Sequence, residues 1–178
     1  YILEKKINLK KEISIIVTRF LNNDCLIFEP FENYHVNQIL NKSIIPADVS
    51  KNILEKAKQQ AKLIAEKLDY IGTMCVEYFI DENNNLLVNE IAPRVHNSGH
   101  LTINAYNVSQ FENHIRAVCN LEKIELKKVY NAEMINIIGE DIKAYREKSW
   151  SKKEFFFDYL KKEIKKKRKM GHITTIKP

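Results

Sequence analysis

The chain has 178 residues, of which 44% are hydrophobic and 29% are charged, and its formal net charge is +6. These values exclude a disordered polypeptide and allow one domain, or one and a half, with a sizeable core. No run approaches the roughly 18 consecutive apolar residues of a membrane span, and no signal peptide is visible. Three widely spaced cysteines predict buried, reduced thiols in a cytosolic protein, not a disulfide framework or a zinc motif.

The net positive charge is confined to one short segment. Residues 161–169 contain seven Lys or Arg and one Glu, whereas the rest of the chain has 22 basic and 22 acidic residues. A nucleic-acid-binding module that uses this run is therefore one alternative function. The run lacks the interleaved aromatic residues of single-strand binders, which disfavours that alternative.

The amino-terminal third is predicted to be mostly strand. Tyr1 is not Met, and the first residues read as the inside of a strand, so we expect the start of the protein to be missing. Branched residues predict strands at 2–3 and 13–17, and a turn at 22–24 precedes a strand at 25–28. The polar segment 33–46 is predicted to be a loop.

A helix is predicted to begin after Ser50 and to end before Gly72. Ser50 can cap its first turn, and an apolar stripe follows at helical spacing, formed by Ile53, Ala57, Ala61, Ile64 and Leu68. Two strands, 73–80 and 86–91, flank a polar hairpin loop, and Pro93 ends the second strand.

The carboxy-terminal half is predicted to contain a loop, a helix and short strands. Residues 96–100 form the loop, and the capping box 109–112 opens a helix that runs through Cys119. A strand is predicted around 134–138, and Phe155 to Phe157 are predicted to be strand core. The best domain boundary lies near 121–128.

A pair of glutamates on the predicted hairpin is the first candidate site. If the hairpin is centred on Asn83 and Asn84, opposite residues sum to 167, and Glu77 faces Glu90. Directly opposed like charges destabilise a sheet, so a shared proton, a basic side chain or a hard cation must neutralise them. Mg²⁺ prefers such oxygen ligands together with substrate phosphates. An exposed face on which the glutamates pair with lysines is the alternative.

The segment after Glu90 gathers further polar groups. Arg94 suits a bidentate grip on a carboxylate, bicarbonate or phosphate, and Gly99 permits a close backbone approach. His96 and His100 are four residues apart, but the intervening Asn-Ser-Gly argues against a helical zinc pair. Ser98 lacks a nucleophile-elbow motif, and His35 and His114 have no nearby ligand partners in the sequence.

These residues carry a family resemblance. The segment Asn89-Glu-Ile-Ala-Pro-Arg-Val-His-Asn-Ser-Gly-His100 resembles the signature of 5-(carboxyamino)imidazole ribonucleotide synthetase, an ATP-grasp ligase. Five flanking blocks follow in family order, at 70–79, 109–112, 114–117, 136–139 and 168–172. The resemblance covers nearly the whole chain.

The resemblance implies a function and a set of site residues. The family couples ATP, bicarbonate and aminoimidazole ribonucleotide to form the N-carboxylated product, ADP and phosphate, in de novo purine biosynthesis. Glu77 and Glu90 would hold Mg²⁺ (or Mn²⁺). The nucleotide would be bound by Glu4, Lys5, Lys6, Ile7, Glu12, His35, Asn89 and Glu90. Bicarbonate or carboxyphosphate would be held by Arg94, lined by His96, Asn97, Ser98 and His100.

The basic tail matches the family's closing motif, in which Lys161, Arg168 and Lys169 would grip the substrate 5′-phosphate and the triphosphate. Lys166 and Lys167 stand where the family usually has Pro-Gly, and Gln38 replaces a common glycine. The first ATP-grasp lobe, with its glycine-rich phosphate loop, is absent, so we expect no turnover from these 178 residues alone.

The predicted fold is α+β. The resemblance implies the carboxy-terminal lobe of an ATP-grasp domain at 1–121, an antiparallel sheet with flanking helices. A small, mostly-β domain follows at 122–178. The resemblance also implies a cytoplasmic enzyme that is homodimeric at full length. Another ATP-grasp carboxylase or formyl ligase of purine metabolism is the nearest alternative function.

Overall fold

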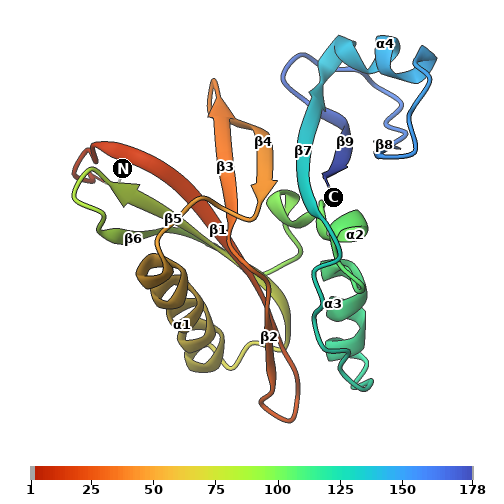
Figure 1. Ribbon diagram of the computed structural model, residues 1–178. Coiled ribbons are helices and arrows are strands. Elements are labelled where there is room, and N and C mark those ends of the chain that lie inside the picture. Colours follow the sequence, from red (N-terminus) through yellow and green to blue (C-terminus); the bar gives the residue numbers. More distant parts are fainter. Residues whose placement is uncertain (1–2, 178) are drawn as a thin grey trace.

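The computed structural model describes residues 3–177, and nine strands in that range form one antiparallel sheet. The order across the sheet is β6-β5-β1-β3-β4-β7-β9-β8, and β2 pairs with β1 (Figure 1). The strands are β1 (Leu9–Arg19), β2 (Cys25–Ile27), β3 (Phe31–Val36), β4 (Ile39–Ile45), β5 (Gly72–Asp81), β6 (Leu86–Ala92), β7 (Asn131–Ile138), β8 (Glu154–Asp158) and β9 (Lys169–Lys177). The predicted α+β class is confirmed.

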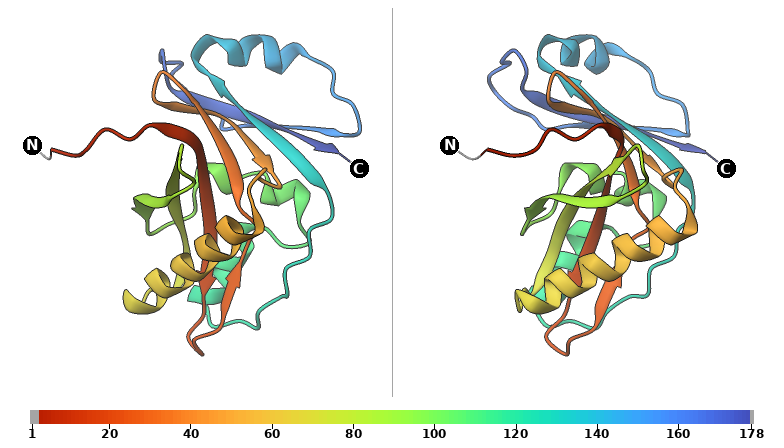
Figure 2. Two further views of the ribbon diagram at one scale, coloured as in Figure 1. Left: turned by 60° about the vertical axis from the view of Figure 1, so that its left-hand side comes forward. Right: turned by 90° about the vertical axis from the view of Figure 1, so that its left-hand side faces the viewer.

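Helices cover both faces of the strands β1, β5 and β6. The α-helices are α1 (Lys51–Lys67), α2 (Thr102–Ala105), α3 (Gln110–Val118) and α4 (Ile142–Glu147), and the 3₁₀ turns are η1 (Asn97–Gly99) and η2 (Gly139–Asp141). Figures 1 and 2 show α1 on one side of these strands and α3 on the other. No helix among residues 3–177 has the length and apolar character needed to cross a bilayer.

The helix α1 forms where the sequence predicts it. The Ser50 hydroxyl accepts a hydrogen bond from the Ile53 amide at 3.3 Å, which satisfies one of the free donors of the first turn. Its buried stripe consists of Ile53, Ala57, Ala61 and Ala65. The predicted stripe was wrong at Leu68, which is 57% exposed. The left-handed residue after the helix is Asp69, and Gly72 instead opens β5.

Alternation along β1 and β5 separates an apolar face from the face that carries polar groups. Ile13, Ile15 and Val17 point toward α1 and pack in one core cluster with residues of that helix. The intervening Ser14 lies on the opposite face, and Cys75 and Glu77 lie on the same opposite face of β5. The strand period therefore places these three side chains together on the side away from α1.

The prediction of a loop at 33–46 was wrong, because this segment forms most of the hairpin β3–β4. Asn37 and Gln38 make its turn with φ angles of 50° and 65°, so Gln38 adopts a left-handed conformation that favours glycine. The strands lack regular hydrophobic alternation because Asn33, His35 and Ser43 face other polar groups. Polarity here marks a face of the sheet on which polar side chains bond to one another, not a loop.

Other local predictions also need correction. Leu3 is exposed and lies outside any strand, while Ile2 lies outside the described residues. Phe155 to Phe157 do form a strand, but Phe155 and Phe157 are exposed and only Phe156 packs against a core cluster. All three cysteines are free, as predicted, yet Cys119 is exposed.

The last three strands extend the same sheet. β7 pairs with β4, and β9 lies between β7 and β8. The strand β9 was not predicted, because it begins at the end of the basic run. This arrangement places Lys169, its first residue, on the same continuous sheet as the hairpin β5–β6.

Candidate active site

A cavity of about 450 Å³ lies on the face of the sheet away from α1. Its walls come from β1, β3, β5 and β6, and from the turn between β3 and β4. The lining residues are Glu12, Ile13, Asn33, His35, Gln38, Glu77, Tyr78, Phe79, Asn89 and Glu90. The cavity therefore brings together five of the predicted site residues, which are spread over nearly 80 positions of the sequence: Glu12, His35, Glu77, Asn89 and Glu90.

Glu77 and Glu90 are directly opposed, as predicted. The register changes at Asn89: Tyr78 pairs with Val88, whereas Glu77 pairs with Glu90, so Asn89 is an extra residue on β6. The prediction that opposite residues sum to 167 was therefore wrong for the loop half of the hairpin and right for the half that holds the glutamates. A β-bulge of this kind re-aims side chains and is frequent beside active sites.

Burial is the main cause that raises the pKa of Glu77, and the neighbouring carboxylates Glu90 and Glu12 add to it. His35 and Lys169 act in the opposite direction. The Glu77 side chain is only 17% exposed, so its charge is poorly solvated. The site thus holds a carboxylate whose negative charge requires a positive partner.

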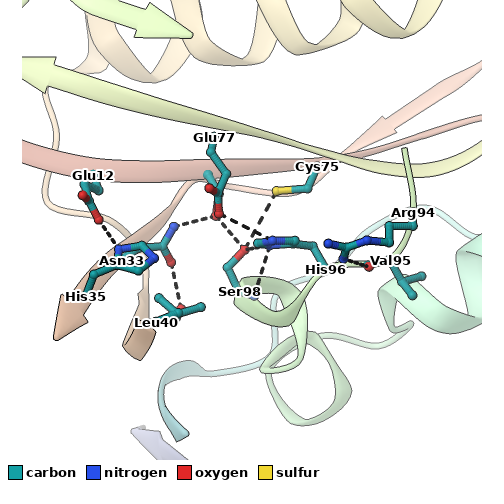
Figure 3. Close-up of polar contacts among 12 residues, drawn as sticks. Glu12, Asn33, His35, Leu40, Cys75, Glu77, Arg94, Val95, His96 and Ser98 are labelled. Atoms are coloured by element: carbon teal, nitrogen blue, oxygen red, sulfur yellow. Dashed lines mark hydrogen bonds and ion pairs between the residues drawn. The ribbon is translucent and has the colours of Figure 1, made fainter. Parts of the chain in front are cut away.

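A chain of hydrogen bonds fixes the imidazole of His96 beside Glu77 (Figure 3). The Asn33 amide donates to the Ser14 hydroxyl at 2.9 Å, and Ser14 donates to the Ser98 hydroxyl at 2.8 Å. Since the Ser98 oxygen accepts from Ser14, its own proton points to His96 Nδ1, 2.9 Å away. His96 Nε2 then carries the ring proton and lies 3.5 Å from a Glu77 oxygen.

Burial lowers the pKa of His96 to about 4, and the positive charges of Arg94 and Lys169 contribute. At neutral pH the imidazole is uncharged, so its contact with Glu77 is not an ion pair. Ser98 orients the imidazole of His96.

Gln110 clamps the backbone of His96. Its amide nitrogen donates to the His96 carbonyl at 2.6 Å, and its amide oxygen accepts from the His96 N–H at 2.9 Å. A Cβ atom on Gly99 would lie 2.8 Å from the Gln110 amide. The close approach expected at Gly99 is therefore one between its backbone and the Gln110 side chain. From the sequence, Gln110 is predicted only to be part of the capping box 109–112.

The rest of the 94–100 segment is divided between exposed and buried groups. Arg94 is exposed, and its guanidinium donates to the Val95 carbonyl at 3.1 Å. The side-chain amide of Asn97 is buried and has no hydrogen-bond partner among the described residues. His100 Nδ1 lies 2.9 Å from the Tyr159 hydroxyl, which in turn lies 2.9 Å from His172 Nδ1. His100 is thus bound to β9 and the end of β8.

Comparison with known proteins identifies the family. The model of the ATP-grasp domain matches residues 1–111, and the model described as "Phosphoribosylaminoimidazole carboxylase C-terminal domain" matches residues 132–178. The chain belongs to the ATP-grasp family. It is 45% identical over 177 residues to N5-carboxyaminoimidazole ribonucleotide synthase of Bacillus subtilis. The matched region covers 99% of this chain and 47% of that protein. The chain therefore spans about half the length of the curated relatives it matches.

Solved ATP-grasp structures share this architecture. N5-carboxyaminoimidazole synthetase from Staphylococcus aureus, complexed with ADP, superposes with a TM-score of 0.91 at 44% identity and covers 98% of this chain and 48% of that one. The Aspergillus clavatus synthase in complex with ADP and 5-aminoimidazole ribonucleotide gives a TM-score of 0.91 at 32% identity, with the same coverage.

The ATP-grasp cavity is flanked by one half-buried lysine. Burial lowers the pKa of Lys169, although the charge of Glu77 acts to raise it. The positive charge of Lys169 in turn acts to lower the pKa values of Glu77, His35 and His96. Lys161 donates to the Lys169 carbonyl at 2.6 Å, whereas the Arg168 side chain is exposed. This hydrogen bond joins Lys161 to the first residue of β9.

The predicted adenine linker, residues 4–7, lies outside the cavity. It has no regular secondary structure, and its side chains are exposed or half-buried. Figure 2 shows the amino-terminal arm extending away from the sheet. By contrast, Glu12 is in contact with His35 Nδ1, and this contact is the main cause that raises the pKa of His35.

Proposed function

We propose that the protein carboxylates 5-aminoimidazole ribonucleotide with bicarbonate, using ATP and Mg²⁺ (or Mn²⁺), and releases ADP and phosphate in de novo purine biosynthesis. The observation that carries this proposal is the cavity that joins Glu12, His35, Glu77, Asn89 and Glu90. The complexes of the relatives with ADP and with 5-aminoimidazole ribonucleotide support it. No observation on the molecule favours another ligase acceptor.

The residues present fit a magnesium ion. Glu77 and Glu90 are opposed on neighbouring strands, and the raised pKa of Glu77 reflects a carboxylate that burial and two neighbouring acids leave short of positive charge. Mg²⁺ is typically held by one or two carboxylates together with substrate phosphates. When bound, the ion would neutralise phosphate charge. Asn89, pushed out by the bulge, and the pair Glu12–His35 would contact the nucleotide.

Bicarbonate binding is assigned to the segment 94–100. Arg94 provides an exposed guanidinium: one Nη donates to the Val95 carbonyl, and the remaining N–H groups would contact an anion. The neutral His96 presents its Nε2 proton toward Glu77, 3.5 Å away, and Ser98 holds the ring there. The buried amide of Asn97 has no hydrogen-bond partner among residues 3–177. His100 contributes by joining this segment to β9.

The basic tail is assigned to phosphate binding. Lys169 is near Glu77, so it would contact the phosphates of ATP or the carboxyphosphate, while Lys161 and Arg168 would bind the ribonucleotide 5′-phosphate. The Lys161 ammonium donates to the Lys169 carbonyl, so it is held against the chain. This contact favours a small-molecule site over a nucleic-acid-binding surface. We also propose the division into an ATP-grasp part at 1–121 and a small domain at 122–178. We further propose that the full-length protein is a homodimer and is located in the cytoplasm.

The decisive experiment replaces the corresponding segment of the Bacillus subtilis relative with this chain and measures ADP release. We expect release that depends on both bicarbonate and aminoimidazole ribonucleotide and that is lost in the Glu90→Gln variant. ADP release that does not depend on aminoimidazole ribonucleotide would contradict the proposed acceptor. A Glu82→Gln variant is the matched control, because Glu82 is an exposed glutamate of the same hairpin and does not line the cavity.

A further inference from the structure

A second set of metal-ligating atoms lies beside the carboxylate pair. The Cys75 sulfur, a Glu77 carboxylate oxygen and a His96 ring nitrogen all lie within 4.8 Å of one another. Cys75 and Glu77 are two residues apart on β5 and so point to the same face, and His96 approaches from the loop after β6. Glu90 does not belong to this set, which therefore differs from the opposed glutamates.

The donor types suit a different ion from magnesium. Thiolate and imidazole ligands favour borderline-soft cations such as Zn²⁺, whereas Mg²⁺ takes oxygen ligands. A single point can lie within about 2.8 Å of three atoms that are at most 4.8 Å apart, and zinc bonds are about 2.0–2.3 Å long. Side-chain shifts of well under an ångström would therefore bring all three donors to bonding distance.

Hydrogen bonds orient the imidazole of the three-donor set. Ligating histidines usually have their second nitrogen fixed by a hydrogen bond, which sets the tautomer and the ring orientation. In the ion-free protein His96 Nδ1 accepts from Ser98, so Nε2 becomes a ligand only when the ring proton moves to Nδ1 and the Ser98 oxygen accepts it. Ser14 and Asn33 hold Ser98 in place. The nitrogen that faces Glu77 is Nε2. Glu77 also lines the cavity, so the three donors lie at its wall.

We propose that Cys75, Glu77 and His96 form a binding site for a cation of the zinc class, which shares Glu77 with the magnesium pair but does not use Glu90. An ion bound there would hold Glu77 and His96 away from the nucleotide and bicarbonate, so the site is inhibitory. This inhibitory consequence rests on the proposed function, whereas the binding site itself does not. Binding displaces the thiol proton of Cys75 to solvent as the sulfur–metal bond forms. The imidazole proton moves from Nε2 to Nδ1, where the Ser98 oxygen accepts it, and the Ser98 hydroxyl proton turns toward the Cys75 sulfur, 4.0 Å away.

The experiment is a Co²⁺ titration of the purified chain, with Zn²⁺ as competitor. We expect one equivalent of Co²⁺ to produce a thiolate-to-metal charge-transfer band that Zn²⁺ removes. The Cys75→Ser variant should lose the band. The Cys119→Ser variant is the matched control and should keep it, because Cys119 is exposed and lies outside the cluster. Absence of the band in the unmodified chain, or its persistence in Cys75→Ser, would overturn the proposal.

Two further measurements keep the test independent of folding defects and of the proposed function. X-ray absorption of the unmodified zinc-loaded chain should show one sulfur and otherwise nitrogen or oxygen ligands; a shell without sulfur, or with two sulfurs, would refute the site. The Glu90→Gln variant should keep the cobalt band. Failure of the unmodified chain to bind Mg²⁺ would count against the magnesium pair alone and leave the zinc-class site standing.

Discussion

Glu77 on β5 faces Glu90 on β6 at the register pair next to the bulge at Asn89, so two carboxylates of like charge lie opposite each other at one wall of the cavity. Burial raises the pKa of Glu77, with Glu90 and Glu12 as further causes. An acid with a raised pKa in the folded state contributes full stability below its unfolded pKa and loses it as pH rises through the folded pKa. At neutral pH the pair therefore destabilises the protein.

The first prediction concerns this pair. The double variant Glu77→Gln with Glu90→Gln should raise the free energy of unfolding by about 1 kcal/mol at pH 7 without Mg²⁺, since it removes a directly opposed charge pair. Urea unfolding followed by circular dichroism measures the effect. The Glu82→Gln control should change stability by less than half of that. Lower stability in the double variant would show that the glutamates are neutralised by other side chains.

Magnesium should stabilise the unmodified chain but not the double variant Glu77→Gln with Glu90→Gln. Excess Mg²⁺ stabilises a protein that binds it in the folded state only, so it should raise the melting temperature of the unmodified chain and leave the double variant unchanged. Thermal melts with and without Mg²⁺ test this directly. An equal shift in both proteins would place the ion elsewhere.

The second prediction concerns the Tyr159 hydroxyl, which lies 2.9 Å from both His100 Nδ1 and His172 Nδ1. Tyr159→Phe leaves two buried ring nitrogens without this partner, so we expect a loss of about 1–3 kcal/mol of unfolding free energy. Tyr130→Phe is the matched control, because Tyr130 is 40% exposed. An unchanged unfolding midpoint in Tyr159→Phe would mean that the hydroxyl does not join β8 and β9 to the 94–100 loop.

The third prediction is an acid-sensitive window set by buried histidines. Burial lowers the pKa of His172 to about 4, and burial together with His172 lowers that of His100 to about 3. Unfolded histidines bind protons below about pH 6.5, so stability is lost as pH falls from that value toward 4. His172→Gln should make the unfolding free energy less dependent on pH between 6.5 and 4.5. An unchanged slope would contradict the burial argument.

His35 provides a control with the opposite sign. Contact with Glu12 raises the pKa of His35, so its contribution is fully present below the unfolded pKa and is lost as pH rises above it. His35→Gln should therefore alter the pH dependence above about 6.5 and leave the acid window as it was. The two variants together separate the two classes of histidine.

The fourth prediction tests the clamp on His96. Because a Cβ on Gly99 would lie 2.8 Å from the Gln110 side chain, Gly99→Ala should cost about 1–3 kcal/mol through displacement of that side chain. In a Gln110→Ala background the same substitution should cost much less, since the colliding atoms are gone. A double-mutant cycle by urea unfolding measures the coupling. Strictly additive effects would indicate that the clash is relieved without moving Gln110.

Much of the scaffold could be predicted because its signals are local. The apolar spacing from Ile53 to Ala61 and the cap at Ser50 define α1, and the polar hairpin loop between two apolar runs defines β5 and β6. The hairpin β3–β4 could not be predicted from hydrophobic alternation, because polar residues occupy buried positions in it. Asn33 donates a hydrogen bond to Ser14 and accepts one from Ser43. Those partners come from other strands, so no local pattern reveals them.

The sequence by itself determined the family and the hairpin, because a signature segment and a polar loop between two apolar runs are local patterns. It also predicted the pairing of Glu77 with Glu90, but the register next to the loop would place Asn89 opposite Glu77, and the bulge sets the observed pair. Only the tertiary structure decided that Asn89 is a bulge, that His96 points Nε2 at Glu77, and that Cys75 lies beside both. Gln110, Tyr159 and His172 were likewise found only in three dimensions. Their roles depend on contacts between segments distant in the chain, and such contacts are set by sheet register and helix packing, not by any residue's neighbours in sequence.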